Sequence, residues 1–298
     1  MERRQLEYFL AVVEHGGFSN AARVLHVSQP SLSQSIASLE HALGGILFHR
    51  LPHGTTLTAA GDALVGPAKQ VARDLRTAAD AVREVLGLSG GHLDVVAQTT
   101  LAMDPLADLI GLFLCQRPQV TVNVTDPVNG ADVVAQVRSG AAELGLVDSA
   151  VPIGDLRSEL MGLRHLQLVL PPGTTALSPT PLESLKDLRF VATPEGTATR
   201  AVINNAMSLV NLRPRISVET AHRAMIVPLV MAGAGCALLP EGMAADAAVK
   251  GATVVRVQPE LTYRARMIWR VGELSPAAAY FVNMAISSNG GSGAGQPV

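Results

Sequence analysis

The stretch SNAARVLHVSQPSLSQSIASLEHAL, residues 19–43, decides the fold of the N-terminal part of this 298-residue chain. Its second half predicts a helix, because apolar residues recur at spacings that place them along one side. These residues are Leu32, Ile36, Leu39 and Leu43. We expect that side of the helix to face a core.

The opposite side of this helix is neutral, small and rich in hydrogen-bonding groups. Ser28 is placed to cap the N-terminus, and Pro30 can occupy the first turn without the loss of a needed donor. The free N–H groups of that turn would suit a phosphate. The residues expected to face outward near this end are Ser28, Gln29, Pro30, Ser31, Ser33 and Gln34.

Two shorter apolar stripes precede this helix, in residues 6–13 and 18–25, with Ser19 as the expected cap of the second. Three short helices, the last with Gln and Ser at its start, predict a helix-turn-helix that enters the major groove of DNA. Helix spacing alone leaves two alternatives open. One is a Ser-capped helix pair in an unrelated core, and the other is a helix hairpin that binds protein.

The run LEYFLAVVEHGGFSNAARVLHVSQPSLSQSIASLEHALGGILFHR, followed by LTAAG, resembles the N-terminal domain of LysR-type transcriptional regulators. The match is dense and spans about the first sixty residues, so it is more specific than a short motif. The resemblance implies double-stranded DNA as a partner. It also implies a homodimer or homotetramer, and RNA polymerase as a further partner.

Residues 50–57, RLPHGTTL, predict a hairpin-like wing, because Pro52 and Gly54 favour a turn. In the resembling family this wing often carries an Arg that reaches a minor groove. Here the tip offers only His53 as a candidate for that contact. Arg50 is expected either to hold a phosphate or to form a surface ion pair.

A long helix is predicted from the cap Thr58 to about Leu86, with Pro67 as a bend near its start. Its apolar positions alternate in steps of four and three, which is the seam of a coiled coil. The alternative is a helix packed on its own domain. A pair of such helices predicts an interrupted palindrome as operator. The seam comprises Leu64, Ala68, Val71, Leu75, Ala78, Val82 and Val85.

Composition limits the class of protein. Hydrophobic residues make up 48% of the chain and aromatic ones 3%, which indicates globular aliphatic packing. The net charge of -2 favours only modest non-specific DNA affinity, so dimerisation and base readout must compensate. A charged N-terminus and two cysteines fit a cytoplasmic protein. Residues 224–240 are uncharged, but Pro and Gly interrupt them, which favours a buried helix and strand over a membrane span.

After the glycine-rich GLSGG, apolar runs alternate with amphipathic stretches, which predicts parallel sheets with crossover helices. This region resembles the LysR effector domain, which is similar to periplasmic solute-binding proteins. The resemblance implies two α/β subdomains, crossed near Leu163 and again near Arg264, with a ligand cleft at the carboxyl ends of strands. The partner of that cleft would be a small-molecule effector of unknown identity.

The predicted fold is therefore an α+β multidomain chain with a winged helix-turn-helix, a long linker helix and a two-subdomain, periplasmic-binding-protein-like effector domain. The boundaries are 1–57 for the DNA-binding domain, 58–87 for the linker and dimerisation helix, 88–91 for a hinge, 92–163 plus 265–287 for effector subdomain I, 164–264 for subdomain II, and 288–298 for a disordered tail.

Polar residues at predicted strand ends are candidate effector contacts. Thr99 and Thr100 follow the first effector strand and could hold a carboxylate or merely cap a helix. Asn129 and Asp148 end or follow the next strands, where they could bind ligand or simply terminate a strand.

Further candidates come from the predicted second subdomain. Thr193 precedes and Thr197 ends the PEGT turn before a helix, and His222 is the one nearby group that titrates around neutral pH. A lone His is more often structural. The acidic Glu195 and Asp148 argue against a strongly anionic effector, unless Arg200 and Arg223 turn inward.

The sequence contains no complete enzyme motif. GAGCAL lacks the third glycine of a dinucleotide loop, and no phosphate-binding loop, GxSxG or CxxC is present. The eight His residues lack metal spacing, and the placement of Cys115 and Cys236 makes a peroxide switch improbable. We therefore expect no catalysis, metal or cofactor. The leading interpretation is an effector-controlled transcriptional regulator. The alternative is a cytoplasmic small-molecule binding protein whose N-terminal helices assemble partners.

Overall fold

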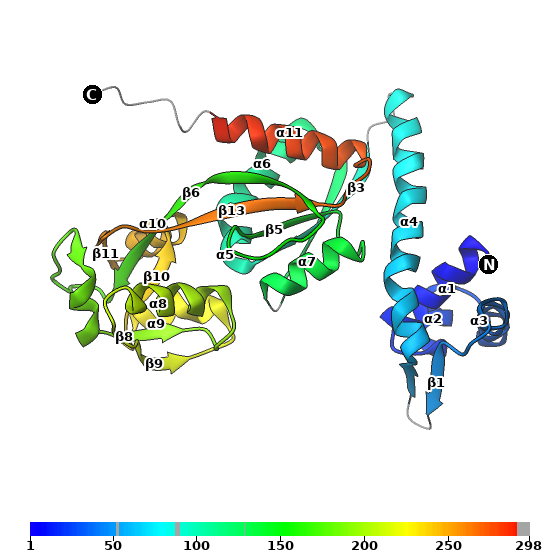
Figure 1. Ribbon diagram of the computed structural model, residues 1–298, viewed down its shortest axis with the longest axis horizontal. Coiled ribbons are helices and arrows are strands. Elements are labelled where there is room, and N and C mark those ends of the chain that lie inside the picture. Colours follow the sequence, from blue (N-terminus) through cyan, green and yellow to red (C-terminus); the bar gives the residue numbers. More distant parts are fainter. Residues whose placement is uncertain (52–53, 87–89, 128, 291–298) are drawn as a thin grey trace.

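The computed structural model describes residues 1–51, 54–86, 90–127 and 129–290. Three parts follow one another along the chain (Figure 1): a small helical unit with a two-stranded wing, the long helix α4, and a larger α/β part with two lobes. Among the described residues no helix is both long and apolar enough to cross a membrane.

The N-terminal unit consists of α1 (Arg3–Glu14), α2 (Phe18–Val24) and α3 (Gln29–Leu43). Their apolar stripes meet in one core, in which Phe9, Leu32 and Ile36 are fully buried. Two details of the prediction were wrong. Leu43 is 45% exposed, because the helix ends there at Gly44 in the left-handed conformation. Gly17, not Ser19, is the N-cap of α2.

The wing pairs β1 (Phe48–Leu51) with β2 (Gly54–Leu57) in antiparallel register. Thr58 joins it to α4, because the Thr58 hydroxyl donates to the Ile46 carbonyl at 2.7 Å and accepts from the Gly61 N–H at 3.0 Å. The predicted cap is thus confirmed. A Cβ on Gly61 would lie 2.2 Å from the Leu47 carbonyl oxygen, so only glycine allows this close approach.

Helix α4 (Ala59–Val85) includes Pro67 and carries the predicted apolar seam. The seam has a packed first part and an exposed second part. Leu64 and Ala68 pack into the N-terminal core, so they are not available to a partner. From Val71 onward the seam is exposed, with Val82 60% and Val85 88% accessible. The seam is therefore packed on its own domain only over the first turns.

The first lobe, called lobe I, contains β3 (Gly91–Ala97), β4 (Val120–Thr125) and β5 (Leu144–Asp148). Its helical elements are α5 (Thr99–Leu101), the π-helical turn η1 (Ala102–Leu106), α6 (Ala107–Gln116), α7 (Gly130–Arg138) and α11 (Pro276–Gly290).

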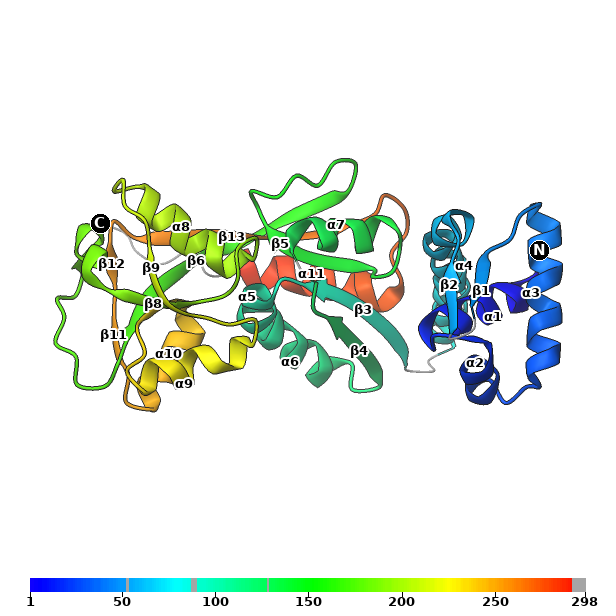
Figure 2. The ribbon, with the colours of Figure 1, turned by 90° about the horizontal axis from the view of Figure 1, so that it is seen from below.

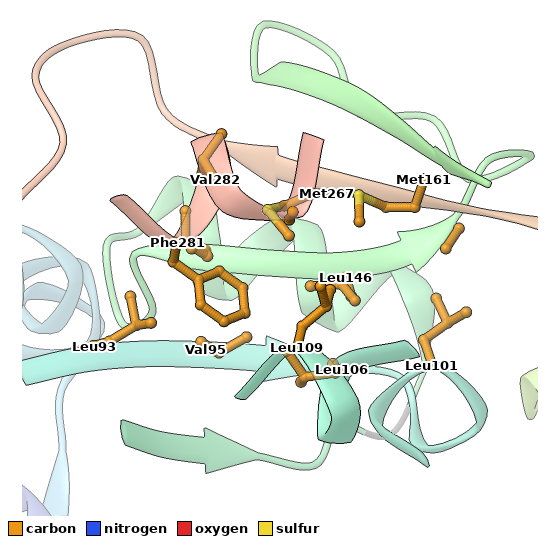
Figure 3. Packing of buried hydrophobic residues seen from close by; sticks show 14 of the residues in the cluster. Leu93, Val95, Leu101, Leu106, Leu109, Leu146, Met161, Met267, Phe281 and Val282 are labelled. Atoms are coloured by element: carbon orange, nitrogen blue, oxygen red, sulfur yellow. The ribbon is translucent and has the colours of Figure 1, made fainter. Parts of the chain in front are cut away.

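Alternate residues of the lobe I strands point to opposite faces of the sheet. Leu93, Val95 and Leu146 pack with Phe281 of α11 and Leu109 of α6 in one apolar layer (Figure 3). Their neighbours Val96 and Val147 pack under α7 on the other face. Both faces of the sheet are therefore covered.

The second lobe, called lobe II, holds further strands and helices around its own core. Its elements are β7 (Thr180–Pro181), η2 (Leu182–Asp187), β8 (Arg189–Ala192), α8 (Ala198–Ser208), β9 (Arg215–Glu219), η3 (Arg223–Met225), α9 (Ile226–Met231), β10 (Ala237–Pro240), α10 (Glu241–Val249), β11 (Thr253–Val255) and β12 (Val257–Gln258).

Two long strands, β6 (Arg157–Leu170) and β13 (Leu261–Trp269), run antiparallel through both lobes (Figures 1 and 2). Leu163 lies opposite Arg264 in this ladder. The main sheet has the order β10-β6-β13-β5-β3-β4 with β11 beside β6. It is mixed, because only β3 with β4 and β3 with β5 are parallel there. The prediction of parallel sheets holds for those pairs, for β8 with β9 and for β7 with β12.

The end of the chain differs from the predicted boundary. Helix α11 continues to Gly290, so residues 288–290 are helical and not part of a disordered tail. The rest of the predicted tail, residues 291–298, lies outside the described residues, as do residues 88 and 89 of the predicted hinge. Gly91 of that hinge is the first residue of β3. The uncharged stretch forms α9 and β10, as predicted.

Candidate DNA-binding face and effector cavity

The start of α3 is an exposed polar surface held from behind by a fully buried stripe. Ser28 caps the helix, because its side chain accepts a hydrogen bond from the Ser31 N–H at 3.3 Å. The Gln29 Nε2 atom donates to the Ser33 hydroxyl at 3.3 Å. Gln29, Pro30, Ser31 and Gln34 are exposed, and Ser33 is half-buried. These groups can offer both donors and acceptors to base edges.

Helix α3 lies at the end of the molecule farthest from the two lobes in both views (Figures 1 and 2). Glu40 fixes it to the start of the wing, because its Oε1 accepts from the Leu47 N–H at 2.7 Å and from the Phe48 N–H of β1 at 3.4 Å. Arg50 belongs to β1, but its side chain lies outside the described residues, and so does His53. Their predicted contacts with DNA stay predictions.

A cavity of about 340 Å³ lies between the lobes at the carboxyl ends of β3 and β5. Its apolar lining comes from both lobes and from β6: Leu101, Val151, Pro152, Leu166, Ala201 and Val202. Its polar lining is Gln98, Thr100, Asp148, Thr197, Asn205 and Tyr263. An apolar enclosure with a few converging polar groups is typical of a small-molecule site.

Three predicted effector residues line this cavity: Thr100, Asp148 and Thr197. Asp148 ends β5, and its Oδ1 accepts from the Ala150 N–H at 2.8 Å. Thr197 is also the N-cap of α8, since its hydroxyl accepts from the Arg200 N–H at 3.4 Å. A capping role and a place in the cavity wall are therefore combined in one residue.

The other four predicted residues lie outside the lining. Asn129 caps α7, because its side chain accepts from the Asp132 N–H at 3.1 Å. Thr193 is buried behind the wall and shares a hydrogen bond with the Thr197 hydroxyl. His222 is exposed at the start of η3, and its N–H donates to the Thr220 hydroxyl. Thr99 adjoins the lining but bonds Asp126 instead, at 2.7 Å.

Sequence reasoning missed three polar residues of the lining: Gln98, Asn205 and Tyr263. Gln98 is buried, and its Oε1 accepts from the Asp148 N–H at 2.7 Å, which ties the ends of β3 and β5 together. The Tyr263 hydroxyl is buried and has no hydrogen-bond partner among the described residues. Burial raises the pKa of Tyr263. The sequence predicts effector contacts only at strand ends and helix starts, and Tyr263 lies within β13.

The two arginines that the sequence analysis considered for the cavity are already paired. Arg200 contacts Glu195 at 2.7 Å and Glu219 at 2.9 Å. Arg223 contacts Asp126 at 3.0 Å. Neither lines the cavity.

Comparison with known proteins gives the same division of the chain into two regions. A family model described as "Bacterial regulatory helix-turn-helix protein, lysR family" matches residues 3–62, and one described as "LysR substrate binding domain" matches residues 86–289. The chain belongs to the LysR family of helix-turn-helix transcriptional regulators. This is a family of regulators and not of enzymes, and its members bind DNA and small-molecule effectors.

Curated relatives carry the same description. The uncharacterized HTH-type transcriptional regulator YdcI of Escherichia coli (strain K12) is 32% identical over 66% of this chain and 65% of that protein, so the match spans just under two thirds of YdcI. YybE of Bacillus subtilis (strain 168), also named an uncharacterized HTH-type transcriptional regulator, is 27% identical over 96% of this chain and 99% of that protein.

Solved structures match the whole architecture. CbnR, a LysR family transcriptional regulator, has a TM-score of 0.74 and 26% identity, with coverage of 97% of this chain and 99% of that chain. Full-length CbnR in complex with its target DNA has a TM-score of 0.72 and 25% identity, and the match covers 97% of this chain and 100% of that chain.

Proposed function

We propose that this regulator binds an interrupted palindrome as a homodimer and reads base edges with the start of α3. The observation that carries the proposal is the exposed Gln and Ser face of α3, which is braced by buried residues on its other side. The contact residues would be Ser28, Gln29, Pro30, Ser31, Ser33 and Gln34, with Arg50 and His53 from the wing.

The exposed seam of α4 supports the dimer. On another side α4 lies against lobe I, where Arg76 contacts Asp94 at 3.5 Å, while Val71, Leu75 and Val82 of the seam stay exposed. A cleft of about 670 Å³ lies between α1, α4 and lobe I, and its lining includes Leu10, Val13 and Leu75. The partner's α4 would cover these apolar side chains, which would otherwise stay in water.

A small molecule in the cavity between the lobes would control the regulator. It would favour one arrangement of the lobes and so change the relative placement of the paired DNA-binding units. Such control requires different affinities for the two arrangements. The proposal extends to pairing of dimers into tetramers and to contact of the DNA-bound protein with RNA polymerase. The protein would act by binding and not by catalysis.

The test begins with an operator obtained by selecting DNA from a random library with the full-length protein. Binding of that operator is then measured by fluorescence anisotropy for the wild type and for Ser33→Ala with Gln34→Ala. We expect specific affinity to fall at least about tenfold, because a good base contact discriminates by about 1–3 kcal/mol. Non-specific binding and its salt dependence should not change, because no phosphate contact is removed.

His41→Ala is the matched control, because His41 is exposed on the same helix but lies near its C-terminal end. This variant should bind the operator like the wild type. Unchanged operator affinity in the double variant would remove the start of α3 as the recognition surface. Circular dichroism and thermal unfolding verify that each variant is folded.

A further inference from the structure

We propose that the effector is a compact apolar amine, with an ammonium group bound at Asp148 and the Tyr263 hydroxyl. The inference rests on the proposed function, because it takes the cavity between the lobes as the effector site. It concerns the charge of the ligand that the cavity would bind.

One part of the cavity is lined by apolar side chains from both lobes. Leu101 from lobe I, Leu166 from β6 and Val202 from lobe II line it together, so an apolar body between them would touch both lobes and the strand that joins them. The volume of about 340 Å³ is at the small end of the range for small-molecule sites. A compact hydrocarbon body fits such a space better than an extended polar one.

The described lining of the cavity carries one negative charge and no positive charge. Asp148 is the one formally charged side chain among the described lining residues, which include no Arg, Lys or His. Its carboxylate is half-buried and lies in no ion pair of the described residues. A carboxylate ligand would meet like charge there without a compensating cation. An ammonium group would meet opposite charge.

The nearby arginines do not change this balance, because each is paired with a carboxylate. Arg164, whose charge acts on Tyr263, contacts Asp104 at 3.5 Å. The side chain of Arg200 is largely buried between Glu195 and Glu219 and also donates to the Thr193 carbonyl and to Asn204. Arg223 is bound to Asp126 and Thr99. Each guanidinium therefore has its own carboxylate partner and is not directed at the cavity. A ligand carboxylate would have to displace one of these partners.

Tyr263 supplies the second polar contact. It lies on β13, and its hydroxyl is buried without a partner among the described residues. Its side chain lies on the same face as Asp148, because β13 pairs with β5 and Ala265 lies opposite Asp148. A buried hydroxyl without a hydrogen bond is costly, and a ligand that supplies one removes that cost. An ammonium group can donate to the hydroxyl oxygen and to the carboxylate at once.

The experiment compares three probes that share a phenylalkyl body: 3-phenylpropylamine, 3-phenylpropanol and 3-phenylpropanoate. Binding to the full-length protein is measured by isothermal titration calorimetry at neutral pH. We expect the amine to bind at least about tenfold more tightly than the carboxylate, with the alcohol between them, because only the amine complements the Asp148 charge.

Two substitutions test separately the ligand's contact with Asp148 and its contact with Tyr263. Asp148→Asn should weaken amine binding at least about tenfold and leave alcohol binding within about twofold, because the charge is lost but the shape is kept. Tyr263→Phe should weaken both ligands without lowering the melting temperature, because the hydroxyl has no protein partner to lose. Glu273→Gln is the control, because Glu273 is an exposed carboxylate outside the cavity lining.

Ala201→Trp and Val202→Phe fill the cavity, and the folding of each variant is checked by circular dichroism. These variants distinguish a wrong effector site from a wrong assignment of the effector as an amine. If the carboxylate binds most tightly and either filled cavity abolishes its binding, the effector site stands and the amine assignment is overturned. If none of the probes binds, or if binding survives in both filled variants, the cavity is not the effector site. DNA binding by α3 is measured separately and depends on neither result.

Discussion

Arg223 of lobe II and Asp126 of lobe I are joined across the two lobes: Arg223 Nη1 donates to both Asp126 carboxylate oxygens, at 3.0 and 3.2 Å. The same nitrogen donates to the Thr99 hydroxyl, which in turn donates to Asp126. We call these three residues the clasp. Thr99 is next to Thr100 of the cavity wall, so the clasp holds the lobes together beside the cavity.

Asp126→Asn should loosen the clasp without unfolding the protein. The Asp126 side chain is 63% exposed, so the ion pair contributes less than about 1 kcal/mol to the free energy of unfolding. The lobes should separate more often, because one of the contacts that cross between them is weakened. We expect faster backbone hydrogen exchange in α5 and η3, measured by mass spectrometry, with little change in melting temperature.

The control for the clasp is Asp155→Asn, which breaks the ion pair between Arg138 and Asp155 within lobe I, at 3.2 Å. It removes a comparable surface charge pair without touching the junction of the lobes. Equal exchange of α5 and η3 in both variants would show that the clasp does not govern how often the lobes open.

The exposed half of the α4 seam predicts a dimer that charge can disrupt. Leu75→Glu together with Val82→Glu would place charges inside an apolar helix pair, where water cannot solvate them. We expect the variant to sediment as a smaller species than the wild type in analytical ultracentrifugation. Its helix content should persist, because Leu64 and Ala68 still anchor α4 to its own core.

Ala81→Glu is the matched control, because Ala81 is an exposed residue that flanks the seam. A charge at a flanking position stays in contact with water when helices pair. This variant should keep the wild-type assembly. An unchanged sedimentation coefficient in the double variant would mean that the seam does not join the copies.

The N-terminal unit was predictable because its determinants are local. Leu32, Ile36 and Leu39 are spaced for one side of a helix, and all three are fully buried. Thr58 could be named as a cap because capping depends on residues within one turn. The exposure of Leu43 was missed because a helical period continues past the point at which the core ends.

The α/β part was less predictable because its contacts are distant in sequence. Strand β6 begins at Arg157, and residues 157–166 of it pair with β13, which lies far away in the sequence. Asn129 and Thr193 were placed near the cavity by the order of strands, but local hydrogen bonds turn their side chains elsewhere. The clasp joins Arg223 to a residue 97 positions away, which no local pattern reveals.

The two cysteines should differ sharply in reactivity. Cys236 is buried, and burial raises its pKa to about 12, so almost no reactive thiolate forms at neutral pH. Cys115 is exposed. We expect one fast-reacting thiol per native chain with Ellman's reagent and a second only after unfolding. Cys115→Ser should abolish the fast reaction. Fast modification of Cys236 in that variant would contradict its burial.

A buried carboxylate makes stability depend on pH. Glu143 accepts hydrogen bonds from the Ser275 N–H at 2.7 Å and from its hydroxyl at 2.9 Å. Burial raises the pKa of Glu143 above its ordinary value of 4.5, although these hydrogen bonds and the nearby Arg73 oppose the rise. Between the ordinary and the raised pKa, the folded chain holds a proton that the unfolded chain has released. Stability therefore falls as pH rises through that window and levels off above it.

Glu143→Gln should flatten part of this dependence, because an amide does not titrate and its oxygen can still accept from the Ser275 N–H. The free energy of unfolding in urea, measured at about pH 5 and about pH 8, should fall less between the two pH values in this variant than in the wild type. Some fall should remain, because burial also raises the pKa of Asp104. Glu159→Gln, at an exposed residue, should keep the wild-type difference. An equal fall in the Glu143 variant would show that this carboxyl does not set the pH dependence.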